Sequence, residues 1–260
     1  MKRACFLLLM CILLTGTSYG FDVSGLQPVA PYGIFSTFSA ESLPRGKVAL
    51  EAGFERSNEP DFYRFSARAA YGISDSFEFE ITVPYVYDYG DSVDGMEDVS
   101  VGFKHRFYEE GKYGPSLAYL INASINNGRD EFSTHGRFGG GLIVSKRVGP
   151  FKGHFNVLYE RPGTGSLEDE ITFQGGIEFS AAHNFKMLGE LLARKSYPTN
   201  VYDKIEARFG YRIKTTDSIY TTFGAGVDLK RRSPEYRIMI SISYTPPEKK
   251  KEIKKIFEEE

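Results

Sequence analysis

The feature that most constrains this chain is an alternation of apolar and polar side chains that begins at Gly46. A period of two residues is the period of a β-strand whose two faces meet different environments. In the first stretch Val48, Leu50 and Phe54 alternate with polar or small residues. Along the chain the apolar phase is almost free of formal charge, and the exceptions, such as Lys146, lie close to the ends of their stretches. A face that excludes charge in this way is typical of strands in contact with lipid.

The alternation falls into twelve segments separated by turn or loop sequences. They cover residues 47–56, 62–72, 76–88, 96–108, 115–126, 136–148, 151–160, 169–182, 184–195, 202–214, 218–230 and 235–245. A tilted strand of about eleven residues covers ~25 Å, the height of a barrel's apolar band. An even number of strands is typical of bacterial single-chain barrels. The sequence therefore predicts an all-β fold, a transmembrane antiparallel up-and-down β-barrel of about twelve strands.

The two ends of the chain differ from this region. Lys2 and Arg3 precede an apolar run too short to span a bilayer, and Gly20 is a suitable cleavage site. We therefore expect a signal peptide at 1–20, a leader at 21–45 outside the barrel strands, the β-barrel at 46–245 and a charged periplasmic tail at 246–260. Both cysteines lie in the predicted signal peptide, and neither follows the cleavage site as a lipid anchor requires. Cysteine chemistry is thereby excluded from the mature chain.

The amino-acid composition limits the environments and the partners that are compatible with this chain. The chain has 17 Tyr and 21 Phe but no Trp, so any aromatic girdle at the membrane interfaces has to consist of Tyr and Phe. A small acidic excess without a basic patch argues against DNA or RNA as a partner. The mature sequence contains no apolar run of 18 residues, so a barrel is the way in which it would span a membrane.

The connections between segments predict which end of the barrel faces which side. Every second connection is short, such as Gly72–Asp75 and Val148–Pro150, and short turns are typical of the periplasmic side. The longer connections, including Tyr89–Gly95 and Asn127–His135, are expected to face outside. Pro84 removes a ladder hydrogen bond inside a strand, which predicts a β-bulge near the outer rim.

Charged residues on the polar phase change sign from one strand to the next. The residues expected in the lumen are Glu51, Glu55, Arg64, Arg68, Glu78, Glu80, Lys104, Arg106, Glu206, Arg208, Arg212 and Arg237. Opposite charges on neighbouring strands attract, and Arg237 is expected to meet Glu51 and Glu55 when the barrel closes. These side chains either form a selectivity lining for a polar or anionic solute or form a ladder of ion pairs that fills the lumen. The near balance of signs favours the ladder.

Several short motifs resemble those of the outer-membrane transporter barrels of the phenol-degradation meta-pathway type. The matching stretches are Pro31-Tyr32-Gly33, Glu41-Ser42-Leu43-Pro44-Arg45-Gly46, Tyr71-Gly72-Ile73-Ser74-Asp75-Ser76-Phe77-Glu78, Val83-Pro84-Tyr85 and Gly95 to Arg106, which includes Asp98, Gly102 and Lys104. The resemblance covers mainly the first third of the chain. It implies a small-molecule channel and names no substrate.

An acidic outer loop is the one candidate for a metal site. Its carboxylates are those of Asp88, Asp91, Asp94, Glu97 and Asp98. Calcium takes several carboxylate oxygens, but this spacing is not that of an EF-hand loop. We expect a solvated acidic loop bridged to lipopolysaccharide through divalent ions, and we predict neither a resident metal nor a cofactor.

Catalysis is the weakest interpretation. A lipid hydrolase of the outer membrane needs a nucleophile activated by a base, and only Ser133 and His135 lie close together in an outer loop. A third orienting group is not evident, so we predict that the chain is not an enzyme. A soluble lipocalin-like barrel, polar outside and apolar inside, would show the same alternation but needs about eight strands.

Two functional hypotheses remain. In the first, the protein is a passive outer-membrane channel or transporter for an unidentified small molecule, and the leader enters the bore as a plug. In the second, it is a non-conducting structural or surface-interaction barrel. Both place it in the outer membrane after signal-dependent export, with lipid and lipopolysaccharide around it. The last segment ends on Tyr244, as a signal for the barrel-assembly machinery should.

Overall fold

The computed structural model describes residues 22–58, 60–90, 92–165, 167–196, 202–230 and 236–247. In this part of the chain no helix is long and apolar enough to cross a bilayer. The predicted signal peptide, and the predicted tail from residue 248 onward, lie outside the described residues.

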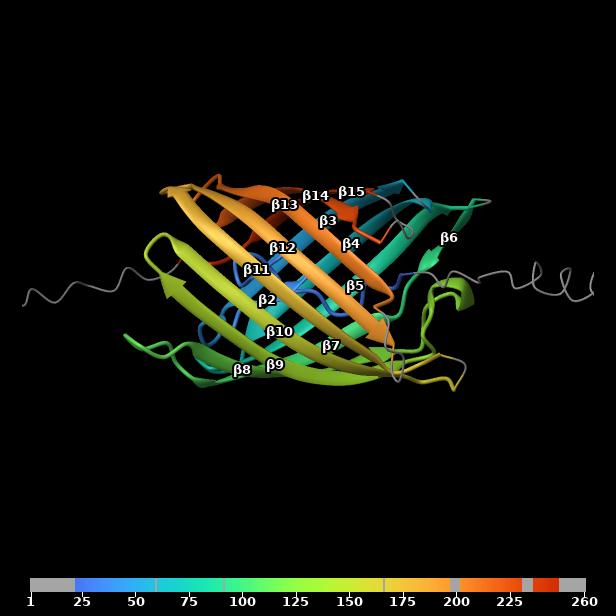
Figure 1. Cartoon of the computed structure of the whole chain (residues 1–260), viewed down its shortest axis with the longest axis horizontal. Coiled ribbons are helices and arrows are strands. Elements are labelled where there is room, and N and C mark those ends of the chain that lie inside the picture. Colours follow the sequence, from blue (N-terminus) through green and yellow to red (C-terminus); the bar gives the residue numbers. More distant parts are fainter. Residues whose placement is uncertain are drawn as a thin grey trace, which may run out of the picture.

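Twelve long antiparallel strands form one closed ring, and each pairs with its neighbours along the chain (Figure 1). They are β3 (Val48–Asn58), β4 (Asp61–Gly72), β5 (Phe77–Tyr89), β7 (Val99–Tyr108), β8 (Ser116–Ile125), β9 (Arg137–Val148), β10 (Phe151–Pro162), β11 (Glu170–Ala182), β12 (Phe185–Ser196), β13 (Lys204–Lys214), β14 (Ile219–Asp228) and β15 (Tyr236–Tyr244). The ring closes where β15 pairs with β3, with Ile240 opposite Phe54. The predicted twelve-stranded barrel is confirmed, and the strand ends agree with the sequence segments to within a few residues.

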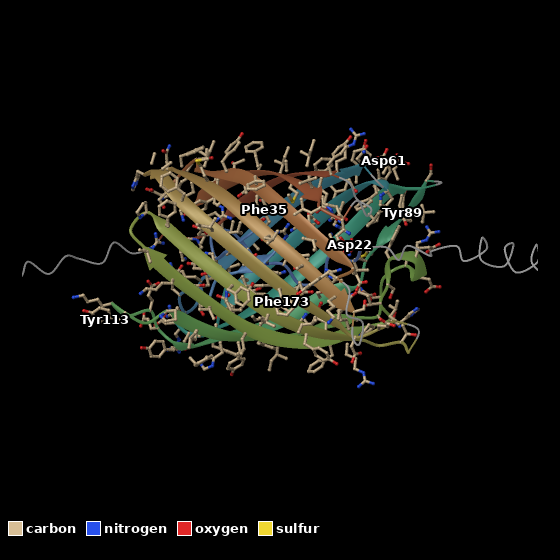
Figure 2. The ribbon with its side chains drawn as sticks, viewed as in Figure 1. Asp22, Phe35, Asp61, Tyr89, Tyr113 and Phe173 are labelled. Atoms are coloured by element: carbon tan, nitrogen blue, oxygen red, sulfur yellow. The ribbon has the colours of Figure 1, made fainter. Side chains whose placement is uncertain are left out.

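The two faces of the wall have the polarity expected of a membrane barrel. Large apolar side chains point outward, and Phe65, Leu142 and Phe209 are about half exposed or more. Charged side chains point inward, and Glu78 and Lys104 are almost completely buried. Figure 2 shows the outward side chains along both edges of the barrel. This polarity is the reverse of that of a soluble lipocalin-like barrel, so that alternative is wrong.

Aromatic rings pair across strands on the outer face. Phe77 and Phe103 stack with their centroids 5.6 Å apart, and Phe151 and Phe179 stack at 4.8 Å. Both pairs lie near the end of the barrel that carries the short turns, because Phe77 and Phe151 are the first residues of their strands. Aromatic pairs of this kind add to the stability of neighbouring strands beyond the area that they bury.

Pro84 marks an irregularity in the wall, as its position in a strand predicted. β5 pairs with β7 up to Thr82 opposite Ser100, and the pairing resumes with β6 (Val93–Met96), where Tyr85 lies opposite Met96. The facing strand has one more residue than β5 between these two pairs, which is the geometry of a bulge. β6 and the short 3-10 helix η1 (Asp130–Phe132) were not predicted from the sequence.

The leader lies inside the barrel. It enters at the end that carries the long loops, where Asp22 contacts β12, β13 and β15, and reaches the opposite end, where Leu43 contacts Glu78 of β5. Midway it forms a two-stranded hairpin of β1 (Gly33–Ile34) and β2 (Thr37–Phe38), visible in blue behind the front strands in Figure 1. We call residues 22–47 the luminal segment.

Candidate functional site: the occupied lumen

Polar side chains of the wall hold the backbone of the luminal segment. Ser24, Gln27 and Arg45 donate their backbone N–H groups to Glu97, Thr82 and Asp75. Backbone N–H groups at six further positions donate in fully buried bonds to wall side chains, which satisfies donors that would otherwise lack a partner. The pairs are Ala30 to Glu51, Ser36 and Thr37 to Glu190, Phe38 to Asn156, Ala40 to Ser145 and Leu43 to Glu78. The segment is therefore bound to the wall along its length, as a strand would be bound in a sheet.

Glu190 of β12 holds the tip of the hairpin. Its carboxylate accepts hydrogen bonds from the backbone N–H groups of Ser36 at 3.0 Å and Thr37 at 2.8 Å, and from the Ser36 hydroxyl at 2.7 Å. Arg208 of β13 balances its charge at 3.1 Å. The tip residue Phe35 has a φ of +33°, a conformation that a non-glycine residue adopts only when its surroundings enforce it. Glu190 supplies the contacts that do so.

Glycines on the inner face of the wall leave room for the segment. The ring of Phe35 fills the space where a Cβ of Gly224 would stand, with its Cε1 atom 2.3 Å from that position. Ile34 lies in the same way over Gly176, and Leu26 lies over Gly102. Since lumen-facing strands normally fill a narrow barrel with their own side chains, these glycines make space for a part of the chain that is not a strand of the wall.

Replacing Gly224 by Leu is expected to push Phe35 out of its position and loosen the hairpin. We expect a cysteine placed at Thr37, in protein expressed from residue 21 onward and therefore without another thiol, to react with maleimide at least tenfold faster in this background. Gly175→Leu is the control, because a Cβ there points outward and meets no atom within 4 Å. Equal labelling rates in the two backgrounds would contradict the proposed packing.

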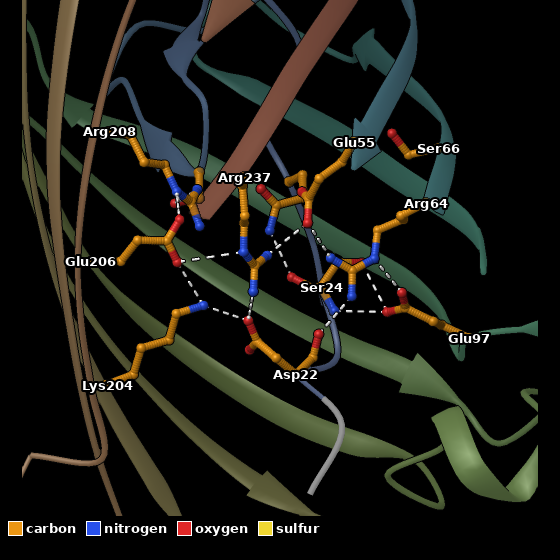
Figure 3. A network of polar contacts seen from close by, with 12 residues as sticks. Asp22, Ser24, Glu55, Arg64, Ser66, Glu97, Lys204, Glu206, Arg208 and Arg237 are labelled. Carbon is orange, nitrogen blue, oxygen red and sulfur yellow. Dashed lines mark hydrogen bonds and ion pairs between the residues drawn. The ribbon is translucent and has the colours of Figure 1, made fainter. Parts of the chain in front are cut away.

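At the end of the barrel that carries the long loops, Asp22 is the centre of a group of cations (Figure 3). Its carboxylate pairs with Arg194 at 2.8 Å and Arg237 at 2.5 Å, and also with Lys204. These three cations come from β12, β15 and β13, so one carboxylate of the luminal segment neutralises charges on three strands of the wall. Charges in a low-dielectric interior need such partners, because an unpaired ion is costly to bury.

A second part of this network lies beside it. Arg64 of β4 pairs with Glu97 at 2.5 Å and with Glu55 of β3 at 3.0 Å. Glu97 also accepts hydrogen bonds from the backbone N–H of Ser24 at 2.7 Å and from its hydroxyl at 3.1 Å. Figure 3 shows that Arg237 stands between the two parts, and its contact to Glu55 at 2.7 Å joins them.

At the other end of the barrel, Lys104 of β7 forms a fully buried triad with two carboxylates of β5. Its ammonium nitrogen lies 2.6 Å from Glu78 and 3.5 Å from Glu80. Glu78 also accepts the backbone N–H of Leu43. This triad therefore anchors the exit of the luminal segment as Glu190 anchors its hairpin.

The structure brings most of the residues predicted in the lumen together, although not always as expected. Glu51 and Arg68 lie opposite each other and pair at 3.1 Å, and Glu206 pairs with Arg208 at 2.5 Å. Arg212 donates to the carbonyl oxygen of Gly33 at 2.7 Å.

One expected pairing is wrong, and other inward charges have partners that the sequence did not predict. Arg237 meets Glu55, but Glu51 lies opposite Ser243. Arg64 and Arg68 do not contact the β5 carboxylates, because the register places them opposite Val86 and Thr82. Arg106 lies near the barrel end and donates to the carbonyl oxygen of Asp75. Whether these charges select a solute stays a prediction.

Sequence reasoning missed the residues that hold the segment, above all Asp22, Asn156 and Glu190. Asn156 both accepts from the N–H of Phe38 and donates to its carbonyl oxygen, at 2.7 and 3.0 Å. The one signal was that Glu190 lies on the inward phase between Leu188 and Leu192, a charge among apolar lumen residues. A partner from outside the strands could have been inferred from that pattern.

Only part of the acidic loop is solvated as expected, with Asp88 exposed and Asp94 half-buried. Glu97 and Asp98 are fully buried, and within the described residues no group of carboxylates and histidines is arranged to hold a metal ion. Asp98 instead accepts hydrogen bonds from the Ser133 hydroxyl at 2.8 Å and from the backbone N–H groups of Thr134 at 2.8 Å and Gly128 at 3.0 Å. It ties the loop before β7 to the loop before β9.

Burial raises the pKa of Asp98, but the hydrogen bonds from Ser133, Thr134 and Gly128 outweigh burial and hold the pKa below its usual value. Because the pKa is lower in the folded than in the unfolded state, the ionised carboxylate stabilises the loops fully at pH values above the unfolded pKa of about 3.9. This stabilisation is lost as the pH falls through the folded-state pKa. We expect Asp98→Asn to speed hydrogen exchange across 128–136 at pH 7. The difference from the wild type should shrink as pH falls below the unfolded value toward the folded-state pKa, and identical exchange at pH 7 would contradict this role.

The hydrolase candidates are not arranged as a nucleophile and its base. The Ser133 hydroxyl donates to Asp98, and its oxygen accepts the backbone N–H of His135 at 2.9 Å rather than contacting the imidazole. His135 itself has a φ of +55° in the turn before β9. The geometry gives the hydrolase interpretation no support.

A cavity of about 100 Å³ remains between the luminal segment and the wall. This is room for several water molecules. Seven Arg and Lys side chains and four carboxylates line it, so the lining has a positive excess. Among them are Arg68, Arg212 and Glu160.

No protein-family model and no curated protein matches the sequence. The fold is similar to solved structures of outer-membrane channels. The COG4313 outer membrane channel from Pseudomonas putida F1 superposes with a TM-score of 0.61 at 13% identity, over 79% of this chain and 97% of the channel. The KdgM porin superposes with a TM-score of 0.58 at 11% identity, over 75% of this chain and 98% of the porin. The NanC porin superposes with a TM-score of 0.57 at 10% identity, over 76% of this chain and 98% of the porin. At such identities the likeness shows the fold, which is that of porin-like outer-membrane barrels.

Proposed function

We propose that this protein is an outer-membrane channel for small polar solutes, preferably anionic ones, and that the luminal segment closes its resting lumen. The observation that carries the proposal is the way in which the lumen is filled. A barrel sealed by its own wall would fill its axis with wall side chains, whereas this wall has inward glycines that leave space for a separate segment. Removing that segment would open a continuous polar passage.

The charged lining supports the preference for anions. The cavity that remains has more cations than carboxylates around it, and rings of Arg and Lys favour anions in narrow pores. The outward apolar face supports a location in the membrane. The resemblance of the leader and first strands to the meta-pathway transporters supports the passage of small molecules.

The test is single-channel conductance of the refolded mature protein in planar bilayers. A disulfide between Thr37→Cys and Gly176→Cys would fix the hairpin to β11, because the Cβ atoms would stand 3.4 Å apart and disulfides have about 3.8 Å. We expect the oxidised protein to stay closed, a reductant to restore openings, and a variant lacking residues 22–45 to conduct several-fold more, with reversal potentials that favour anions.

Two results would reject the proposal. If the folded variant without residues 22–45 conducts no better than the oxidised double-cysteine protein, the lumen is sealed by the wall, and the non-conducting structural barrel becomes the better hypothesis. If reduction changes nothing although both cysteines are shown to have been linked, the segment is not what limits conduction. Heat-modifiable migration on gels is the control for folding in each case.

The path of the segment predicts the position of the mature N-terminus. Asp22 lies at the end of the barrel that carries the long loops, whereas Pro247 follows β15 at the opposite end. We expect an epitope inserted before Asp22 to bind antibody on intact cells, and an epitope placed after Pro247 to bind only once the outer membrane is permeabilised. The reverse pattern would contradict the predicted sidedness.

A further inference from the structure

The outer wall has a hollow over β10, β11 and β12 that no side chain of the described chain fills. Its volume is about 580 Å³. Gly153, Gly175 and Gly189, one from each strand, form its floor. Phe155 and Leu191 are among the apolar side chains that form its rim, and each is about half exposed.

The register explains why the hollow is continuous. Gly175 lies directly between Phe155 and Leu191, and Gly189 lies opposite Phe209 of β13. Gly153 and Gly189 both lie opposite Ile177, and Gly175 lies two residues before Ile177, so the missing side chains form a zigzag groove across the strands. With Ala207 of β13 at its far end, the groove crosses three strand spacings, or about 14 Å.

The packing of the chain itself does not require these glycines. A Cβ at Gly175 would meet no atom within 4 Å, and one at Gly189 would make only ordinary contacts from 3.4 Å. On the inner face the opposite holds, since a Cβ at Gly176 or Gly224 would press on the luminal segment. The inner glycines accommodate a part of this chain, whereas the outer glycines leave space open to the surroundings of the barrel.

Lys146 indicates what would fill that space. It lies opposite Gly153 and two residues before the short turn at the end of β9, and it is a charged residue on the mostly apolar outer phase. Its ammonium group is held by the carbonyl oxygens of Gly111 and Gly114 at 2.8 and 3.1 Å, and by Glu110 at 3.3 Å. One end of the groove therefore lies at the level of lipid headgroups.

We propose that the groove binds one acyl chain of a phospholipid from the periplasmic leaflet, with the lipid headgroup at the level of Lys146 and Glu110. An unbranched chain fits because the groove is long, apolar and floored by backbone. The ion pair of Lys146 and Glu110 at the groove's end stands at headgroup level, so a lipid whose acyl chain fills the groove has its polar part beside a polar group of the wall. This inference rests on the membrane location in the proposed function, although it does not require that the lumen conducts.

The test is native mass spectrometry of the protein released from nanodiscs of phosphatidylethanolamine and phosphatidylglycerol. We expect the wild type to retain one phospholipid, and Gly175→Leu/Gly189→Leu, which fills the groove, to retain it at least fivefold less often. Ala52→Leu/Ala67→Leu is the matched control, because these alanines lie opposite each other on the outer face of β3 and β4, away from the groove. The control should retain lipid as the wild type does.

Equal retention by the groove-filled variant and the wild type would overturn the proposal. Equal loss in the control would do the same, since it would show that retention depends on the outer surface in general. The single variant Gly175→Leu, at the position with most free space, serves if the double variant folds poorly. Failure of the folded wild type to insert into nanodiscs would instead refute the membrane location and with it the proposed function.

Discussion

Glu190→Ala is expected to open the lumen and raise the conductance of the barrel several-fold. The carboxylate accepts three hydrogen bonds from Ser36 and Thr37 and neutralises Arg208. Hydrogen bonds to a charged group contribute about 1.5–3 kcal/mol each. The free energy lost with all three bonds therefore exceeds a free-energy difference of a few kcal/mol between the closed and the open lumen. Conductance in planar bilayers, and maleimide labelling of a cysteine at Thr37, would measure the release of the hairpin.

The matched control is Glu160→Ala. Glu160 is also an inward carboxylate with an Arg partner, at 2.9 Å from Arg137, and it accepts a hydrogen bond from Asn122 at 2.7 Å. Its contacts are to the wall and not to the hairpin, so its loss should destabilise the barrel without opening it. If both variants conduct like the wild type, Glu190 does not hold the segment closed.

Lys104→Met is expected to destabilise the folded barrel by about 3–5 kcal/mol. The substitution leaves the fully buried carboxylates of Glu78 and Glu80 without their cation, and breaking a buried ion pair from one side has a cost of this order. Equilibrium unfolding in urea in the presence of phospholipid vesicles measures the change, with the slope of the transition checked for two-state behaviour.

The triple variant Glu78→Gln/Glu80→Gln/Lys104→Met separates the charge effect from packing. It removes all three charges together, so the uncompensated ions of the single variant are absent and most of the lost stability should return. A triple variant as unstable as Lys104→Met would show that the triad acts through shape or through the hydrogen bond from Leu43 to Glu78 rather than through charge balance.

The barrel could be predicted from the sequence because the alternation of side chains between the two faces is a local property of each strand. Leu50 and Phe54 face lipid, and Glu51 and Glu55 face the lumen, since successive residues of a strand point to opposite sides. Even the irregularity at Pro84 follows from one residue, which lacks the N–H that the ladder needs. The register of β3 and β4 places Glu51 opposite Arg68, as attraction between opposite charges on neighbouring strands suggests.

The interior could not be read in the same way. Asp22 and Glu190 are 168 positions apart in sequence, and the alternation carries no information on which luminal positions meet a segment that belongs to no strand. Glu97 shows the difficulty, because in sequence it belongs to an acidic loop, whereas in the structure it is buried against Arg64 and Ser24. Its partners come from β4 and from the leader, which only the closed barrel brings together.

By itself the sequence determined the class of fold, the number of strands and which face of each strand meets lipid, because a period of two and the exclusion of charge from one phase are properties of each strand alone. The tertiary structure decided that the leader fills the lumen, that Phe35 lies against Gly224, and that Asp98 joins two outer loops. These contacts depend on closure, since a cylinder brings residues from distant strands to one axis and excludes the water that would otherwise satisfy their charges.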